Sequence, residues 1–267
     1  MLNSPLRELS VGEVLDQSFT LLRRNLVPVM VLGLVSFLPA ALVGLFIPTI
    51  GSFVSILGLP ILAAGCVWIA DKGIRGGEVG ISGALGAGFR GGLKLALLWP
   101  LWSFARSALM VIFIVPGALF VGAFFAWKQV LLIEDNWSVL GRSAKLSSGS
   151  LGRIIWVIFI AWLISSLPQA GLTIGQLVAA GDRDPFEAMG SFNALDFAVL
   201  MGTLVLTTFT QAYFHNAVTL LYYDRRVRVD ALDVETSADQ FDAALAGDLQ
   251  DGEAQSGEVQ SGTGPVA

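Results

Sequence analysis

Charged residues are scarce in this 267-residue chain and missing from four long stretches. Asp, Glu, Lys and Arg make up 14% of the residues, against about 25% in an average soluble domain. The stretches without any charge are 26–47, 50–70, 154–174 and 197–221. Each is close to the roughly 20 apolar residues that an α-helix needs to cross a hydrocarbon core. The composition excludes an ordinary soluble domain and predicts an all-α integral membrane protein with several spans.

Cysteine and histidine are nearly missing, since Cys66 and His215 are the only examples of each. A single cysteine excludes an internal disulfide and a cysteine metal cluster, and we expect Cys66 to pack between helices. His215 has no Cys, Asp or second His at ligand spacing, so we expect no metal and no cofactor. The first 25 residues lack the short apolar core of a cleavable signal, which predicts that the first span stays as an anchor.

Lys and Arg are missing from the C-terminal tail. From Asp230 onward the chain carries nine carboxylates and no basic residue, whereas residues 1–229 hold 16 basic and 12 acidic side chains. The net charge of −5 therefore belongs to the tail. Because the tail beyond Thr236 is also poor in apolar residues, it is predicted to be disordered. The sequence thus divides into an amphipathic segment 1–25, a transmembrane domain 26–229 and an acidic cytoplasmic tail 230–267 that offers a surface to an unidentified protein partner.

The segment 7–24 has the pattern of a short amphipathic helix that does not cross the membrane. Its apolar residues recur on one face, and Ser10 with Glu13 forms a capping box. It ends in Arg23 and Arg24 just before the first span. Such a helix lies either in the headgroup layer or against the cytoplasmic loops of the protein itself. Segments 81–89 and 136–149 show a similar pattern and are predicted to be further interfacial helices.

The number of spans depends on residues 95–133. They form one span, 107–127, or two spans, 95–115 and 118–133, that reverse at Pro116–Gly117. Cytoplasmic loops collect Lys and Arg, and six spans with an inner N-terminus place 13 of the 16 basic residues inside. Five spans would instead force the basic residues of 134–153 outside. We therefore predict a six-helix transmembrane bundle, multi-pass in the cytoplasmic membrane, with both termini in the cytoplasm and basic inner loops against anionic lipid headgroups.

Short motifs before and after the predicted spans resemble a known family. They are 9–19 (LSVGEVLDQSF), 115–117 (VPG), 131–134 (LLIE), 139–146 (VLGRSAKL), 221–228 (LYYDRRVR) and 232–233 (LD). In this order they are similar to the glycerophosphoryl diester phosphodiesterase membrane-domain family, over roughly residues 8–235. The resemblance implies a bacterial or archaeal inner-membrane protein with about six helices and interfacial helices between them. The motif positions at the inner helix ends are Glu134, Arg142, Ser143, Tyr223, Asp224 and Arg226.

The same resemblance implies the non-catalytic half of that family. Members with a fused phosphodiesterase barrel carry out catalysis in the barrel, with two histidines and metal-binding carboxylates. This chain has one histidine, and it has no room for a barrel of about 250 residues. At the inner helix ends, facing positions can instead bring Glu134 near Arg142, or Asp224 near an arginine, as clamps between helices.

A second candidate site lies inside the predicted bundle. Arg106 is near the middle of the predicted third span, where an arginine costs about 2.5–3.5 kcal/mol to insert. It either marks an anion path or bonds structurally to neighbouring helices. Thr207, Gln211 and His215 recur every four residues on the predicted sixth span, as helix–helix contacts or as a pore lining.

The expected function follows from these observations. We expect a non-catalytic scaffold or accessory membrane module that is not an enzyme and does not bind nucleic acid. The alternative is a small-solute or lipid transporter with an anion path at Arg106 and the polar stripe of the sixth span.

Overall fold

A computed structural model describes residues 9–112, 114–180 and 194–230, and every regular element within these ranges is an α-helix. Residues 181–193 and the predicted tail from residue 231 lie outside the described residues. The helices are α1 (Val11–Arg24), α2 (Leu26–Phe46), α3 (Pro48–Ile74), α4 (Ile81–Ile112), α5 (Ile114–Ala123), α6 (Trp127–Ile133), α7 (Val139–Ser147), α8 (Leu151–Ala180) and α10 (Ala194–Asp230).

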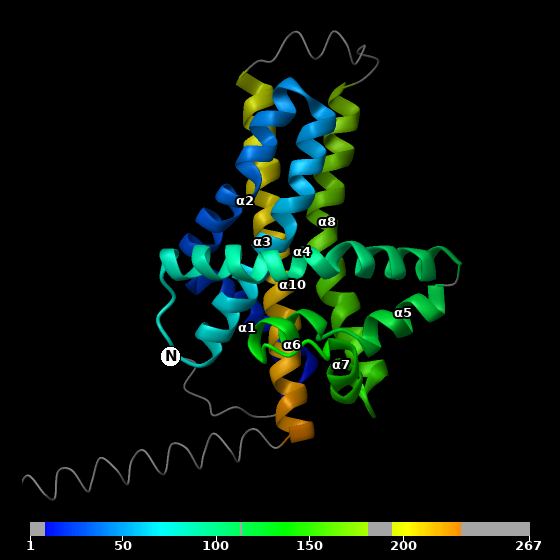
Figure 1. Ribbon diagram of the computed structural model, residues 1–267. Helices are drawn as coiled ribbons and strands as arrows, with labels where there is room; N and C mark the ends of the chain where they lie inside the picture. Colours follow the sequence, from blue (N-terminus) through cyan, green and yellow to red (C-terminus); the bar gives the residue numbers. More distant parts are fainter. Residues whose placement is uncertain (1–8, 113, 181–193, 231–267) are drawn as a thin grey trace, which may run out of the picture.

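Within the described residues, four segments are long and apolar enough to cross a membrane, which confirms the prediction of a multi-pass membrane protein. They are Leu26–Gly44, Val54–Ile74, Val115–Ile133 and Leu151–Gly175. The third of them is divided by a turn at residues 124–126 between α5 and α6. In space, the helices α2, α3, α8 and α10 stand side by side, upright in Figure 1.

Helix α4 lies across the upright helices rather than among them (Figure 1). The predicted interfacial helix 81–89 and the predicted third span 95–115 are one continuous helix as far as Ile112. Glycines permit the crossing, because a Cβ at Gly92 would lie 2.9 Å from the Cα of Ile61 on α3. Two backbones approach this closely only where side chains are missing. The change of direction between α4 and α5 also comes just before Pro116–Gly117 rather than at that pair.

Helix α1 packs on the protein itself. Its predicted capping box is present, since the Ser10 hydroxyl accepts from the Glu13 N–H and the Glu13 carboxylate accepts from the Ser10 N–H. The face that includes Leu21 and Leu22 is buried, and the Phe19 ring meets Phe209 of α10 at 6.4 Å between centroids. The apolar face of α1 is thus covered by other helices of the protein.

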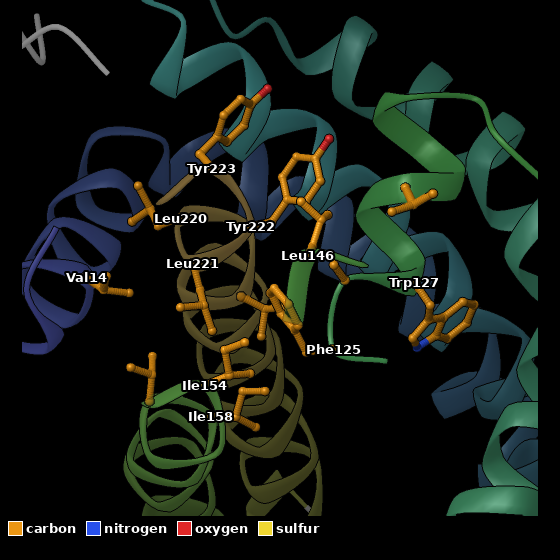
Figure 2. Close-up of a cluster of buried hydrophobic side chains, with 14 of the residues drawn as sticks. Val14, Phe125, Trp127, Leu146, Ile154, Ile158, Leu220, Leu221, Tyr222 and Tyr223 are labelled. Atoms are coloured by element: carbon orange, nitrogen blue, oxygen red, sulfur yellow. The ribbon is translucent and has the colours of Figure 1, made fainter. Parts of the chain in front are cut away.

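Two apolar clusters hold the helices together. One joins the lower ends of α1, α6, α7, α8 and α10 through residues such as Val14, Trp127, Leu146 and Leu221 (Figure 2). The other surrounds Cys66, which is buried as expected. Figure 2 shows the Tyr222 and Tyr223 rings at the edge of the first cluster, with their hydroxyls pointing away from it. The two hydroxyls reach a group of polar and charged side chains around the end of α10, called the polar layer below, which includes Glu134 and Asp71.

Candidate functional site

Consecutive polar residues at the end of α10 reach different parts of this polar layer. Tyr222 donates to the Glu134 carboxylate at the end of α6 (2.9 Å), and Tyr223 donates to Asp71 near the end of α3. Arg225 donates to the carbonyl oxygen of Leu146 on α7 at 2.8 Å. Because successive residues of an α-helix turn by about 100°, a run of polar residues faces every neighbour at once. The end of α10 therefore connects elements far apart in the sequence.

Asp224 is the most deeply buried charge in this layer, with no exposed side-chain area. Its carboxylate accepts from the Leu9 N–H at 2.8 Å, from Arg153 at 2.6 Å and from Arg228 at 3.2 Å. Arg153 also donates to the Leu9 carbonyl oxygen, so one carboxylate joins the entry to α1, the start of α8 and the end of α10. The prediction that Asp224 lies near an arginine is confirmed.

A second ion-pair group surrounds Arg142 of α7. Its Nε lies 3.0 Å from Glu134 Oε2, and its Nη1 donates to Asp230 at 3.1 Å. Hydrogen bonds to Asp230 and Glu134 raise the pKa of the Arg142 guanidinium, and the bond from Arg142 lowers the pKa of the Asp230 carboxyl. Arg226 Nε lies 3.8 Å from Glu134. The predicted pairing of Glu134 with Arg142 is confirmed, whereas sequence reasoning missed Asp230.

A third group joins α3 to α10. Arg75 Nε donates to Asp71 at 2.8 Å and to the Tyr223 hydroxyl at 3.1 Å. Burial, and after it the neighbouring Asp71 carboxylate, raises the pKa of Tyr223. Asp71 and Arg75 were not singled out from the sequence, although Asp71 directly follows a charge-free stretch. A charged residue directly after a predicted span was the feature of the sequence that indicated Asp71 and, one helical turn later, Arg75.

Ser143 has a local structural role. Its hydroxyl oxygen accepts a hydrogen bond from the Ala126 N–H at 3.1 Å, at the turn that separates α5 from α6. The first N–H groups of a helix lack partners within the helix, so a buried hydroxyl at this place stabilises the break. The motif serine therefore supports the backbone between α5 and α6.

The predicted intramembrane site is only partly assembled. Arg106 and His215 line one cavity of about 90 Å³ where α4, α6 and α10 meet. Arg106 is exposed on α4, which lies crosswise, so it meets the cavity at its open edge and not inside an upright bundle. Two further lining residues, Lys128 and Gln129, do not stand out in the sequence as site residues. The Lys128 ammonium lies 4.4 Å from the centroid of the Trp99 ring, a cation–π arrangement.

The remaining polar stripe on α10 holds helices together. Thr207 donates to the Gln169 side-chain oxygen at 3.4 Å, and Gln169 donates to Thr210 at 2.7 Å. Gln211 is half-buried and lies outside the lining of the cavity. The structure thus separates Thr207 and Gln211 from the Arg106 cavity and favours helix–helix contacts for this half of the stripe.

Within the described ranges, no group of three or more His, Cys, Asp or Glu side chains is arranged to hold a metal ion. Scans against models of protein families and searches of curated proteins and of solved structures find no match for this chain.

Proposed function

We propose that this chain is a non-catalytic scaffold or accessory module of the cytoplasmic membrane. The observation that carries the proposal is the polar layer around the end of α10. Its carboxylates Glu134, Asp224 and Asp230 each bind arginines, and together with Asp71 they connect α1, α3, α6, α7 and α8 to α10. Acidic groups committed to arginines in this way stabilise one arrangement of helices. A rigid inner platform suits a protein that positions a partner.

The arrangement of helices supports four crossings, by α2, α3, α8 and α10, with α4 embedded in the inner leaflet. Contacts of Gly65 and Gly88 place α4 against Leu32 of α2. The part of α2 beyond Leu32 is about 20 Å long at about 1.5 Å per residue. With this topology the Lys and Arg of the described residues fall on the inner side or at its boundary. Six crossings, the expectation from charge counting, remain the alternative, and the two differ in where the α4–α5 turn lies.

We also propose that the chain is related to the glycerophosphoryl diester phosphodiesterase membrane-domain family. The support is that motif residues from separate segments meet in the polar layer: Glu134 with Arg142 and Arg226, and Asp224 with the Leu9 N–H. The proposed relationship concerns the membrane half of that family. Together with this relationship we propose an inner-membrane location and cytoplasmic termini.

A transporter is the second candidate, and one observation favours it. Arg106 and His215 line the same cavity, together with Lys128. Against a path through the bundle, Thr207 is bonded to Gln169 of α8. Vesicles that contain the purified protein and take up an organic anion, with uptake reduced in Arg106→Gln but unchanged in Arg90→Gln, would place the transporter above the scaffold.

The scaffold proposal is tested by comparing the full chain with a chain truncated after Asp230. Both are purified from native membranes by mild solubilisation, and co-purifying proteins are quantified by mass spectrometry. We expect at least one defined protein at stoichiometric amount with the full chain and less of it without the acidic tail. The same samples receive glycerophosphodiesters in lipid. Hydrolysis that is abolished in Glu134→Gln would contradict a non-catalytic role.

A further inference from the structure

The cavity between α4, α6 and α10 contains a buried acceptor without a hydrogen-bond partner. Gln129 of α6 lines this cavity and is fully buried. Its side-chain oxygen, Oε1, has no partner in the described part of the chain. Buried polar atoms in native proteins are nearly always paired with protein, water or ligand. A hydrogen-bond donor held beside Gln129 in the cavity would satisfy this oxygen.

Hydrogen bonds on the other side fix the orientation of the Gln129 amide. The Thr219 hydroxyl donates its proton to the His215 carbonyl oxygen at 2.8 Å. The Thr219 oxygen therefore accepts, and it does so from Gln129 Nε2 at 3.3 Å. A flipped amide would set its oxygen against a hydroxyl with no proton left to give. Oε1 is thus directed away from Thr219, and the Gln129 side chain belongs to the lining of the cavity.

Two cations meet the same cavity. Lys128 is held under the Trp99 and Trp127 rings, at 4.4 and 5.7 Å from ring centroids to Nζ. Arg106 lies at the exposed edge of the cavity on α4. The described lining contains no carboxylate, and neither cation has an ion-pair partner among the described residues. Two like charges beside a desolvated space favour an anionic occupant.

We propose that this cavity binds a phosphate group with a neighbouring hydroxyl. The phosphate oxygens accept from Lys128 and Arg106, and the hydroxyl donates to Gln129 Oε1. The volume of about 90 Å³ is well above the roughly 10–15 Å³ that a single water molecule needs, which suits a compact polar group with the rest of its molecule outside. An anionic phospholipid headgroup, as in phosphatidylglycerol, and a free glycerol phosphate both offer this chemistry. This binding activity goes beyond the scaffold role and stands or falls independently of it.

Helix α4 also offers a lipid an apolar surface. Leu97, Leu101 and Phe104 of α4 are 72%, 68% and 74% exposed and lie on the face of the helix opposite Arg106. Acyl chains can lie against α4 while the headgroup reaches the cavity from the edge at Arg106. A free glycerol phosphate would use the cavity alone.

Titration of the purified full chain in neutral detergent tests the proposal. The probes are dihexanoyl phosphatidylglycerol, dihexanoyl phosphatidylcholine, sn-glycerol 3-phosphate and inorganic phosphate, with binding followed by calorimetry. We expect saturable binding of phosphatidylglycerol that is at least about tenfold tighter than that of phosphatidylcholine. Each of Lys128→Met and Arg106→Gln should weaken it by about tenfold or more, the range of a charge-assisted hydrogen bond. Equal affinity for glycerol 3-phosphate would identify the free ester as the source.

Gln129 provides the sharpest variants. Gln129→Met removes the acceptor and should weaken hydroxyl-bearing probes more than inorganic phosphate, whereas Gln129→Glu should abolish binding of every anion. Arg90→Gln on α4 is the matched control for Arg106, and Gln169→Leu, which also removes a helix–helix hydrogen bond, is the control for Gln129; both should bind as the unaltered chain does. If Lys128→Met does not fold by size-exclusion chromatography, the exposed Arg106→Gln carries the test.

Three results would overturn the proposal. One is saturable binding of none of the four probes, which would mean that the cavity holds water alone. Another is an affinity for phosphatidylglycerol that is unchanged in both single variants, Arg106→Gln and Gln129→Glu. The last is an equal loss in Arg90→Gln, which would place the anion on the general basic surface.

Discussion

Neutralising Asp224 is expected to destabilise the protein more than any exposed charge does. In Asp224→Asn the amide oxygen still accepts from the Leu9 N–H, but Arg153 and Arg228 lose their anion. Removing one partner of a buried ion pair costs about 3–5 kcal/mol. Since Arg153 and Arg228 remain 24% and 28% exposed, water compensates in part, and we expect a loss of about 2–4 kcal/mol.

The assay is thermal unfolding of the purified chain in one detergent. At roughly 2–4 °C per kcal/mol, the melting temperature should fall by about 4–16 °C. Asp135→Asn is the matched control, because Asp135 is 70% exposed and pairs with the partly exposed Lys94; its loss should stay below about 1 kcal/mol. The double variant Asp224→Asn with Arg153→Gln should lose less than the sum of the two single losses. Equal effects of Asp224→Asn and Asp135→Asn would refute the role of this carboxylate as a buried connector.

Three further predictions concern the same fold. Arg142 holds the pKa of the Asp230 carboxyl below its ordinary value. The contribution of this ion pair to folding stability is therefore complete above about pH 4 and is lost as the pH falls through the lowered pKa. The difference in melting temperature between the unaltered chain and Asp230→Asn should be full at pH 7 and should disappear in acid. Ser143→Ala leaves a buried N–H without its partner and should cost about 1–3 kcal/mol in the same assay, with Ser143→Thr less harmful. Gly51→Ala would overlap the backbone of α2 and should cost about 1–3 kcal/mol. Gly12→Ala meets nothing within 4 Å and should stabilise α1 by about 0.5–1 kcal/mol. A protein destabilised more by Gly12→Ala than by Gly51→Ala would contradict the close α2–α3 hairpin.

The sequence was sufficient wherever local chemistry or composition decides the structure. Charge-free stretches predicted the membrane class, and the spacing of Ser10 and Glu13 predicted a capping box that is present. The pairing of Glu134 with Arg142 was also predictable. The charge pattern places both residues in the same predicted inner loop, shortly after an apolar segment.

The direction of α4 was not predictable in the same way. Hydropathy records how apolar a segment is, and a helix across the bundle is as apolar as one along it. What distinguishes them is packing, here the fit of Gly88 and Gly92 against Ile61 of α3. The same limit applied to Arg106, whose expected burial depended on α4 standing upright. Partners far away in the chain, such as Asp230 for Arg142, likewise follow only from the packed fold.

The topology with four crossings is tested most directly at Val115, at the start of α5, which is 68% exposed. In a Cys66→Ala background, Val115→Cys is treated on intact cells with an impermeant thiol reagent. Arg183→Cys is the control for the outer side, and Ser148→Cys is the control that reacts only after the cells are permeabilised. The account predicts labelling at position 183 and none at 115, because α4 and α5 do not reach the outer surface. Labelling of position 115 from outside would show that the chain crosses six times and would contradict the proposed arrangement.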